Sequence, residues 1–132
     1  MIFMLVLALG AGMATAQQFT AALAVKEEAA AFSWDEQTFD FGNIEKGKPV
    51  THIFEFINNG TAPLLITNVK PSCGCTTPEW TKDPIPAGGT GFIKTTFNAA
   101  NSGIFNKTIA VSANVVGQVV LTIKGVVQEV VN

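Results

Sequence analysis

The sequence predicts an all-β protein, an immunoglobulin-like antiparallel β-sandwich of about seven strands. From Phe32 onward, apolar and polar residues alternate with a period of two, which is typical of strands with one buried face. Turn-forming Gly, Pro and Asn residues recur roughly every eight to twelve positions, the spacing of a sandwich or barrel. No stretch after Phe32 shows a helical period. A length of 132 residues fits one domain.

The N-terminal segment has the pattern of a secretory signal peptide. Residues 1–25 carry no charged side chain, and the apolar run 2–13 is followed by Ala14-Thr15-Ala16. A buried helix or an uncleaved anchor is the alternative, but a spanning helix needs roughly 20 apolar residues, and Gln17-Gln18 ends the run early. We therefore expect a signal peptide over 1–16, a linker over 17–31 and the sandwich domain over 32–132. The mature chain is expected to be periplasmic or extracellular, with no membrane span.

The strands expected within the domain are bounded by Gly, Pro and Asn clusters. In the longest of them, Val50, His52, Phe54 and Phe56 share one face, and Asn58-Asn59-Gly60 is read as the turn that follows. Residues 83–89 form a Pro- and Gly-rich loop. Because the connections are short, neighbouring strands are expected to pair antiparallel. The expected strands cover 38–41, 50–57, 64–69, 91–97, 105–111 and 119–124.

Composition excludes some functions. Eight Lys and no Arg stand against ten acidic residues, for a net charge of −2, so a nucleic-acid partner is not expected. The carboxylates are scattered over turns and polar strand positions, without a recognisable acid–base pair. No serine nucleophile elbow, phosphate loop or metalloprotease motif occurs. We therefore do not expect an enzyme.

The stretch 71–80, Pro-Ser-Cys-Gly-Cys-Thr-Thr-Pro-Glu-Trp, interrupts the regular strands and holds both cysteines. In an exported protein Cys73 and Cys75 can form a disulfide, which Gly74 would accommodate. They can instead be a thiol pair held for metal binding or redox exchange, or two free thiols packed as small apolar groups. Trp80 is either a plug at the end of the core or part of an exposed contact surface.

His52 is the only histidine. Its place in line with core positions favours a structural role, with its ring nitrogen hydrogen bonded to a loop carbonyl. The alternative is that it joins Cys73 and Cys75 in a metal site, since two thiolates and an imidazole suit Cu(I) or Zn(II). No cofactor is expected outside that copper or zinc alternative.

A set of short motifs is spread over residues 32–127. The motifs are Phe39-Asp-Phe-Gly-Asn-Ile44, Gly47, His52-Ile-Phe-Glu-Phe56, Asn59-Gly60, Pro63-Leu64, Ser72-Cys-Gly-Cys-Thr76, Trp80, Pro86, Gly91 and Lys124-Gly125. Together they resemble the bacterial family called domain of unknown function 1573. The resemblance implies an exported protein, typical of Bacteroidetes, with a Hydin-like, major-sperm-protein-like immunoglobulin fold. It implies no activity.

Two functional hypotheses follow. The first is an exported, non-catalytic module whose sheet edges and end loops contact another protein or a cell-envelope polymer, with strand addition as one mode. The second is a small metal-binding or thiol-redox protein that acts through Cys73, Cys75 and His52.

Overall fold

A computed structural model describes residues 28–130 of the chain, and these residues form strands, turns and loops without a helix. Consequently, no helix in this part of the chain is long and apolar enough to cross a membrane. The expected signal peptide, 1–16, and most of the expected linker, 17–31, lie outside the described residues.

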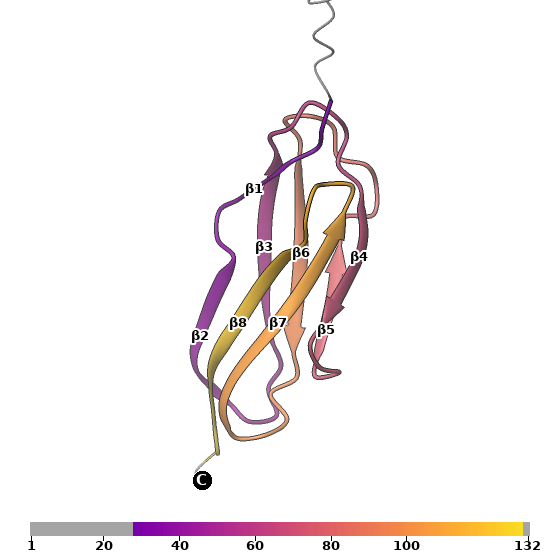
Figure 1. Ribbon diagram of the computed structural model, residues 1–132. Helices are drawn as coiled ribbons and strands as arrows, with labels where there is room; N and C mark the ends of the chain where they lie inside the picture. Colours follow the sequence, from indigo (N-terminus) through magenta and orange to yellow (C-terminus); the bar gives the residue numbers. More distant parts are fainter. Residues whose placement is uncertain (1–27, 131–132) are drawn as a thin grey trace, which may run out of the picture.

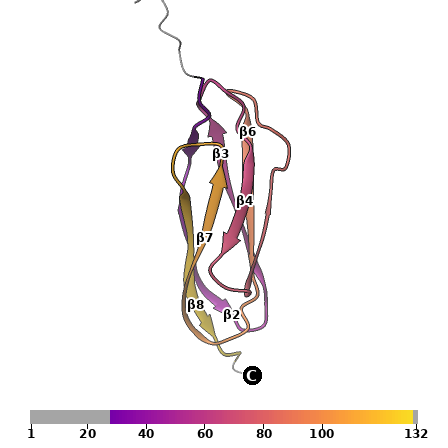
Figure 2. The same ribbon diagram turned by 45° about the vertical axis from the view of Figure 1, so that its right-hand side comes forward.

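Two four-stranded sheets pack face to face (Figures 1 and 2). The first sheet has the strand order β1-β3-β6-β5 and the second has the order β2-β8-β7-β4. The strand bounds are β1 Phe32–Trp34, β2 Thr38–Glu45, β3 Val50–Asn58, β4 Ile66–Pro71, β5 Thr76–Trp80, β6 Thr90–Phe97, β7 Gly103–Ala113 and β8 Val119–Gln128. The predicted immunoglobulin-like sandwich is confirmed.

The strand pairing differs from the expectation in two places. The first strand of the domain is divided, because β1 pairs antiparallel with β3 whereas β2 crosses to the other sheet and pairs parallel with β8. The sandwich is therefore not wholly antiparallel. In addition, Thr76–Trp80, expected to interrupt the strands, forms the edge strand β5, which raises the number of strands to eight. The Pro and Gly residues around it hid its short period-two pattern.

The core lies between the sheets. Phe54, Phe56 and Ile93 of the first sheet and Leu121 and Ile123 of the second are almost completely buried. Their alternation with exposed neighbours along β3, β6 and β8 produces this layer. The predicted inward face of β3 is confirmed, with His52 and Val50 at its half-buried end.

A bulge at Gly42 and a glycine at position 125 shape the contact between β2 and β8. The expected strand end at Gly42 is instead a β-bulge, because the register shifts between Asp40 and Asn43 and the Gly42 amide is capped by the Asp40 carboxylate at 2.8 Å. A Cβ on Gly125, across from the bulge, would lie 2.7 Å from the Gly42 carbonyl oxygen and 2.8 Å from the Phe105 ring. Glycine is therefore required at 125 by packing.

Asn58 organises the opposite end of the sandwich. Its side chain is fully buried, and its Nδ2 donates to the carbonyl oxygens of Ala62 at 2.8 Å and Ile85 at 2.9 Å. Its Oδ1 accepts from the amides of Gly60 at 3.0 Å and Ala31 at 3.2 Å. Asn58 thus ties together three separate segments and is the inward-facing end of β3, not the turn residue that was expected.

Candidate functional site

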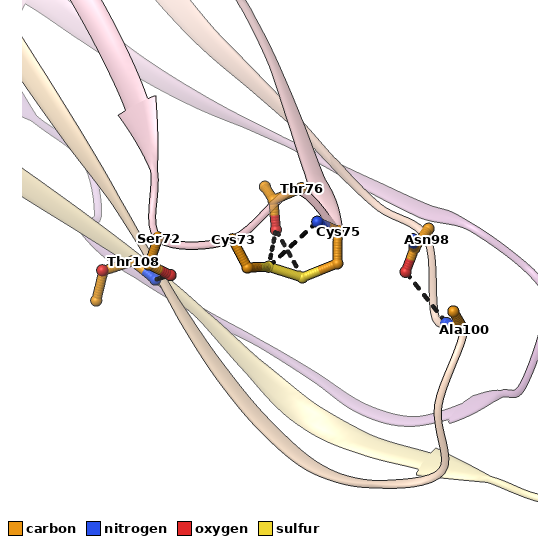
Figure 3. Close-up of a disulfide and its surroundings, with 7 residues drawn as sticks. All are labelled: Ser72, Cys73, Cys75, Thr76, Asn98, Ala100 and Thr108. Atoms are coloured by element: carbon orange, nitrogen blue, oxygen red, sulfur yellow. Dashed lines mark hydrogen bonds between the residues drawn. A yellow bond between two sulfur atoms is a disulfide. The ribbon is translucent and has the colours of Figure 1, made fainter.

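The loop between β4 and β5 carries both cysteines and connects the two sheets at one end of the sandwich. The structure joins Cys73 and Cys75 in a disulfide whose Cα atoms are 5.3 Å apart, with the exposed Gly74 between them (Figure 3). Both cysteine side chains are half-buried, and Cys75 packs against the edge of the core. The bridge is therefore a partly accessible feature of the surface.

Hydrogen bonds hold this loop on both sides. Where β4 ends, the Ser72 amide donates to the Thr108 carbonyl oxygen at 2.8 Å, and the Thr108 amide donates to Ser72 Oγ at 3.1 Å. On the other side, the Asn98 amide donates to the Cys75 carbonyl oxygen at 2.9 Å. Thr76, which is buried, places its hydroxyl 4.0 Å from each sulfur. The loop is consequently fixed to β7 in one sheet and to the end of β6 in the other.

A small pocket of about 120 Å³ lies beside the bridge, between Cys75 and the loop that joins β6 to β7. Its polar lining includes Asn98, Ser102 and Lys107. Ala99 in the same loop is buried and adopts a φ of 54°, an uncommon backbone conformation for a residue with a side chain. Its carbonyl oxygen accepts from the Gly47 amide at 2.8 Å, which helps to hold the loop in place.

A polar contact links this loop to the C-terminal end of β8. The Glu129 carboxylate accepts hydrogen bonds from the Ser102 hydroxyl and from Lys46 Nζ, the latter at 3.1 Å. These hydrogen bonds, first that of Ser102, together with the positive charge of Lys46, lower the pKa of Glu129 below its ordinary value. The β2–β3 loop, the β6–β7 loop and the segment after β8 are thereby connected at one end of the molecule.

His52 lies at the half-buried rim of the core. Its ring stacks on Phe39, with 3.6 Å between the ring centroids, and contacts the edge of Phe54 at 4.7 Å. Its Nε2 is hydrogen bonded to the Glu36 carboxylate, not to the loop carbonyl that the sequence suggested. These contacts give the imidazole aromatic neighbours and one polar partner.

The structure does not bring His52 to the cysteines. His52 faces Thr95 on β6, and Thr95 faces Pro78 on β5, so the backbones of His52 and Pro78 are two strand spacings, about 10 Å, apart. Cys75 lies about 10 Å further along β5 and its preceding loop. Within residues 28–130, no group of three His, Cys, Asp or Glu side chains is placed to hold a metal ion. The set proposed for copper or zinc, His52 with Cys73 and Cys75, is not assembled.

Trp80 ends β5 and is half-buried against the core. Lys82 Nζ lies 3.0 Å from the centroid of its ring, a cation–π contact that covers one face. Trp80 thus combines core packing with a partly covered surface.

An apolar patch on the outer face of the first sheet was not predicted from the sequence. We call Ile53, Ile57 and Phe92 the outer patch; they are 47%, 46% and 39% exposed. Phe92 on β6 pairs with Glu55 on β3, and Glu55 lies between Ile53 and Ile57 in the sequence of β3. The three apolar side chains are therefore neighbours on one face. The signal was present in the sequence, because the outward positions of β3 alternate with its core positions and include two isoleucines.

The family model described as "Protein of unknown function (DUF1573)" matches residues 32–127. The chain belongs to this family. The match covers all eight strands of the DUF1573 domain except the final residue of β8, so the resemblance seen in the sequence motifs is confirmed. No curated protein matches the chain.

Several solved structures share the fold. A protein of unknown function from Porphyromonas gingivalis aligns with a TM-score of 0.67 and 16% identity over 76% of this chain; this chain spans 48% of that protein. The human CEP192 ASH/PapD-like domain 7 aligns with a TM-score of 0.63 and 12% identity, over 78% of this chain and 89% of that domain. The Vibrio cholerae secreted serine protease VesC aligns with a TM-score of 0.57 and 14% identity, over 80% of this chain and 24% of the protease. At these identities the likeness shows the fold alone.

Proposed function

We propose that this DUF1573 domain is an exported, non-catalytic binding module that contacts another protein of the cell envelope. The observation that carries the proposal is the outer patch, in which Ile53, Ile57 and Phe92 leave apolar side chains exposed on a flat, rigid sheet face. Exposed apolar groups that gather on one face commonly mark interaction sites. Their placement on strands rather than on loops supplies a preformed surface.

The electrostatics favour binding over catalysis. The outer patch is interspersed with Glu55, Glu79 and Lys94, and the last two approach each other at 3.8 Å. Such exposed charges suit the polar rim of an interface. A protein partner fits this mixed surface better than a cell-envelope polymer, because large apolar side chains next to charges are typical of protein–protein contacts.

Site-specific photo-crosslinking tests the binding role. The full chain is expressed in its own cells with benzoyl-phenylalanine in place of Phe92, and a matched variant carries it at Lys124 on the outer face of the other sheet. A discrete protein adduct from position 92 that is absent from position 124 is expected. The intact mass of the purified protein reports the leader, because export with cleavage after Ala16 predicts a chain that begins at Gln17. Equal adducts from both positions, or none, would contradict binding through the outer patch, and a retained leader would contradict export.

A second candidate function, thiol–disulfide exchange, is favoured by the half-buried bridge beside the pocket lined by Asn98, Ser102 and Lys107. An incoming thiolate would attack Sγ of one cysteine and release the other as a thiolate, forming a mixed disulfide. Equilibration in glutathione buffers, followed by alkylation and mass measurement, tests this function. A bridge that is reduced within the range of redox-active proteins, roughly −120 to −270 mV, supports exchange, whereas one that resists reduction below about −300 mV contradicts it.

The same reduced sample tests copper or zinc binding. Only Cys73 and Cys75 would supply ligands, because His52 lies elsewhere. Metal retained in equal amount by Cys73→Ser/Cys75→Ser would remove this alternative.

A further inference from the structure

We infer that the uncovered edge of β3, at Thr51 and Ile53 and next to the Glu55 carboxylate, binds an extended cationic peptide segment by strand addition. The site rests on the proposed binding role and assigns it an edge and a ligand class.

The edge is uncovered because the first strand of the domain is divided. β1 pairs only with Phe56–Asn58, after which the chain leaves the first sheet, and by Gln37 its carbonyl oxygen already accepts from the Thr122 amide in the other sheet (Figure 1). Within the described residues, no strand pairs with this side of β3 between Val50 and Glu55. From Val50 to Phe54, β3 thus lacks one neighbour over five of its nine residues.

The hydrogen bonds identify which backbone groups face this edge. The Asn58 amide and carbonyl bond to Gly89 and Gly88 on the β6 side, at 2.8 and 2.7 Å, whereas the Asn59 amide bonds to Ala31 on the β1 side at 3.0 Å. Because antiparallel strands alternate the direction of these groups residue by residue, those of Thr51, Ile53 and Glu55 point to the uncovered edge. The Trp34–Phe56 pairing places Asp35 beside Glu55, so two amides and two carbonyls, those of Thr51 and Ile53, are available to an added strand.

The edges formed by β5, β4 and β2 are protected. The backbone groups of odd-numbered residues of β5 form hydrogen bonds with β6, as the bonds of Cys75 and Thr81 show. Pro78 is even-numbered, so its ring nitrogen faces away from β6. This nitrogen carries no hydrogen and cannot donate to an added strand. Pro71 is placed in the same way on β4, where Ser72 bonds to β7. The β2 edge is bent by the bulge at Gly42. Proline and bulges are the usual means of preventing edge pairing, and the edge of β3 has neither.

Charge identifies the occupant. A hollow of about 110 Å³ lies at the point where β1 ends, and its lining includes Asp35 and Glu55. Within residues 28–130 neither carboxylate forms an ion pair. Because Asp35 lies beside Glu55, a strand added antiparallel to β3 would begin opposite Ile53, next to these two acids, and would place its third residue opposite Thr51. Lysine or arginine at the first position and a branched apolar residue at the third complement this edge.

A second copy of the chain fits less well, because β3 carries no cation between Val50 and Glu55 to meet these acids. A polysaccharide fits less well because it offers no regular row of amide donors. The preferred occupant is therefore a peptide segment of another protein.

The probe is the synthetic peptide acetyl-Lys-Thr-Ile-Thr-Thr-amide, titrated by NMR into the protein purified after expression of the full chain. We expect chemical-shift changes and slowed hydrogen exchange at the amides of Thr51 and Ile53. Methylation of the peptide's Ile nitrogen, which faces β3, should raise Kd at least about fivefold. Methylation of the next nitrogen, which faces away, is the matched control and should change Kd little. Replacement of the peptide Lys by Glu, or Glu55→Gln in the protein, should weaken binding about two- to fivefold.

Three results would overturn the edge site. These are peptide-induced changes confined to other residues, equal effects of the two N-methyl groups, and equal binding of the Lys and Glu peptides. Protection of the two amides that rises with protein concentration in the absence of peptide would instead assign the edge to a second copy. If position 92 forms an adduct but the edge amides do not respond to the peptide, the edge site is wrong and the binding role stands. If there is neither an adduct nor a response of the edge amides, both the edge site and the binding role are wrong.

Discussion

Glycine 125 shows how one missing Cβ determines the approach of two strands. The parallel pair β2–β8 passes the bulge at Gly42 where the backbone of β8 has no side chain, and the Phe105 ring fills the remaining space. The Phe-Asp-Phe-Gly-Asn and Lys-Gly motifs that mark the family are therefore in physical contact across one ladder, with Asp40 opposite Lys124.

Gly125→Ala is expected to destabilise the domain by about 1–3 kcal/mol, because a methyl group there overlaps a backbone carbonyl that cannot move freely. Urea unfolding followed by tryptophan fluorescence measures the effect. The matched control is Gly74→Ala, since a Cβ at Gly74 meets nothing within 4 Å. A Gly125→Ala protein as stable as the Gly74→Ala protein would contradict the packing argument.

The edge strands are the elements at which this fold meets other chains. β4 and β5 close one side of the sandwich with Pro71 and Pro78, while the opposite side leaves part of β3 without a neighbour. The two sides of the same sandwich thus have opposite tendencies to add a strand.

Replacing both prolines by threonine, Pro71→Thr/Pro78→Thr, restores two outward amide donors without removing an internal hydrogen bond. We expect the variant to self-associate with increasing concentration while its unfolding midpoint stays near that of the parent, because open strand edges pair with one another. Sedimentation velocity measures the association. The control Pro63→Thr, outside the strands, should remain like the parent, and a double variant that stays monomeric would show that the prolines do not protect these edges.

The disulfide also acts on a single element, because it shapes one loop. Its ring closes over a single intervening residue, so the chain-entropy estimate of its stabilisation is only about 1.5 kcal/mol, below the about 2–4 kcal/mol typical of longer loops. Cys73→Ser/Cys75→Ser is expected to lower stability by no more than this amount and to leave the far-ultraviolet circular dichroism unchanged. A loss above about 4 kcal/mol would mean that the bridge holds the two sheets together.

At the scale of the whole molecule, Glu129 joins the segment after β8 to two loops, through Lys46 and Ser102. A carboxylate whose pKa is lowered by folding stabilises the folded state above its unfolded pKa, and this contribution is lost as the pH falls through the folded value. The difference in urea midpoint between the parent and Glu129→Gln should therefore be present at neutral pH and disappear below the ordinary glutamate range near about 4.3. The effect is small because the group is exposed. Its persistence at low pH would exclude the ionised carboxylate as the cause.

Much of this architecture follows from period-two alternation. The inward faces of β3, β6 and β8 were predictable because Phe54, Ile93 and Leu121 alternate with polar or exposed neighbours. Asn58 was not recognised, although continuing the alternation of Phe54 and Phe56 by one step places it inside. Its amide side chain satisfies four partners that come from segments distant in the sequence, and such partners have no local signature.

The candidate site was predictable only in part, for the same reason. Cys73 and Cys75 are adjacent in sequence and remain adjacent in space. The relation of His52 to the cysteines depends on strand order, since β6 separates β3 from β5. The division of the first strand also depends on long-range pairing, because β1 and β2 find their partners in different sheets.

This division has a mechanical consequence. The described chain enters at one end of the sandwich and leaves at the other, while β2 and β8 run side by side in the same direction over six residue pairs (Figure 1). Tension applied to the two ends slides these strands along each other, so their hydrogen bonds carry the load together instead of opening one after another. A module under tension between two anchoring points would gain resistance from this geometry, and pulling single molecules in an atomic-force microscope would measure it as the unfolding force.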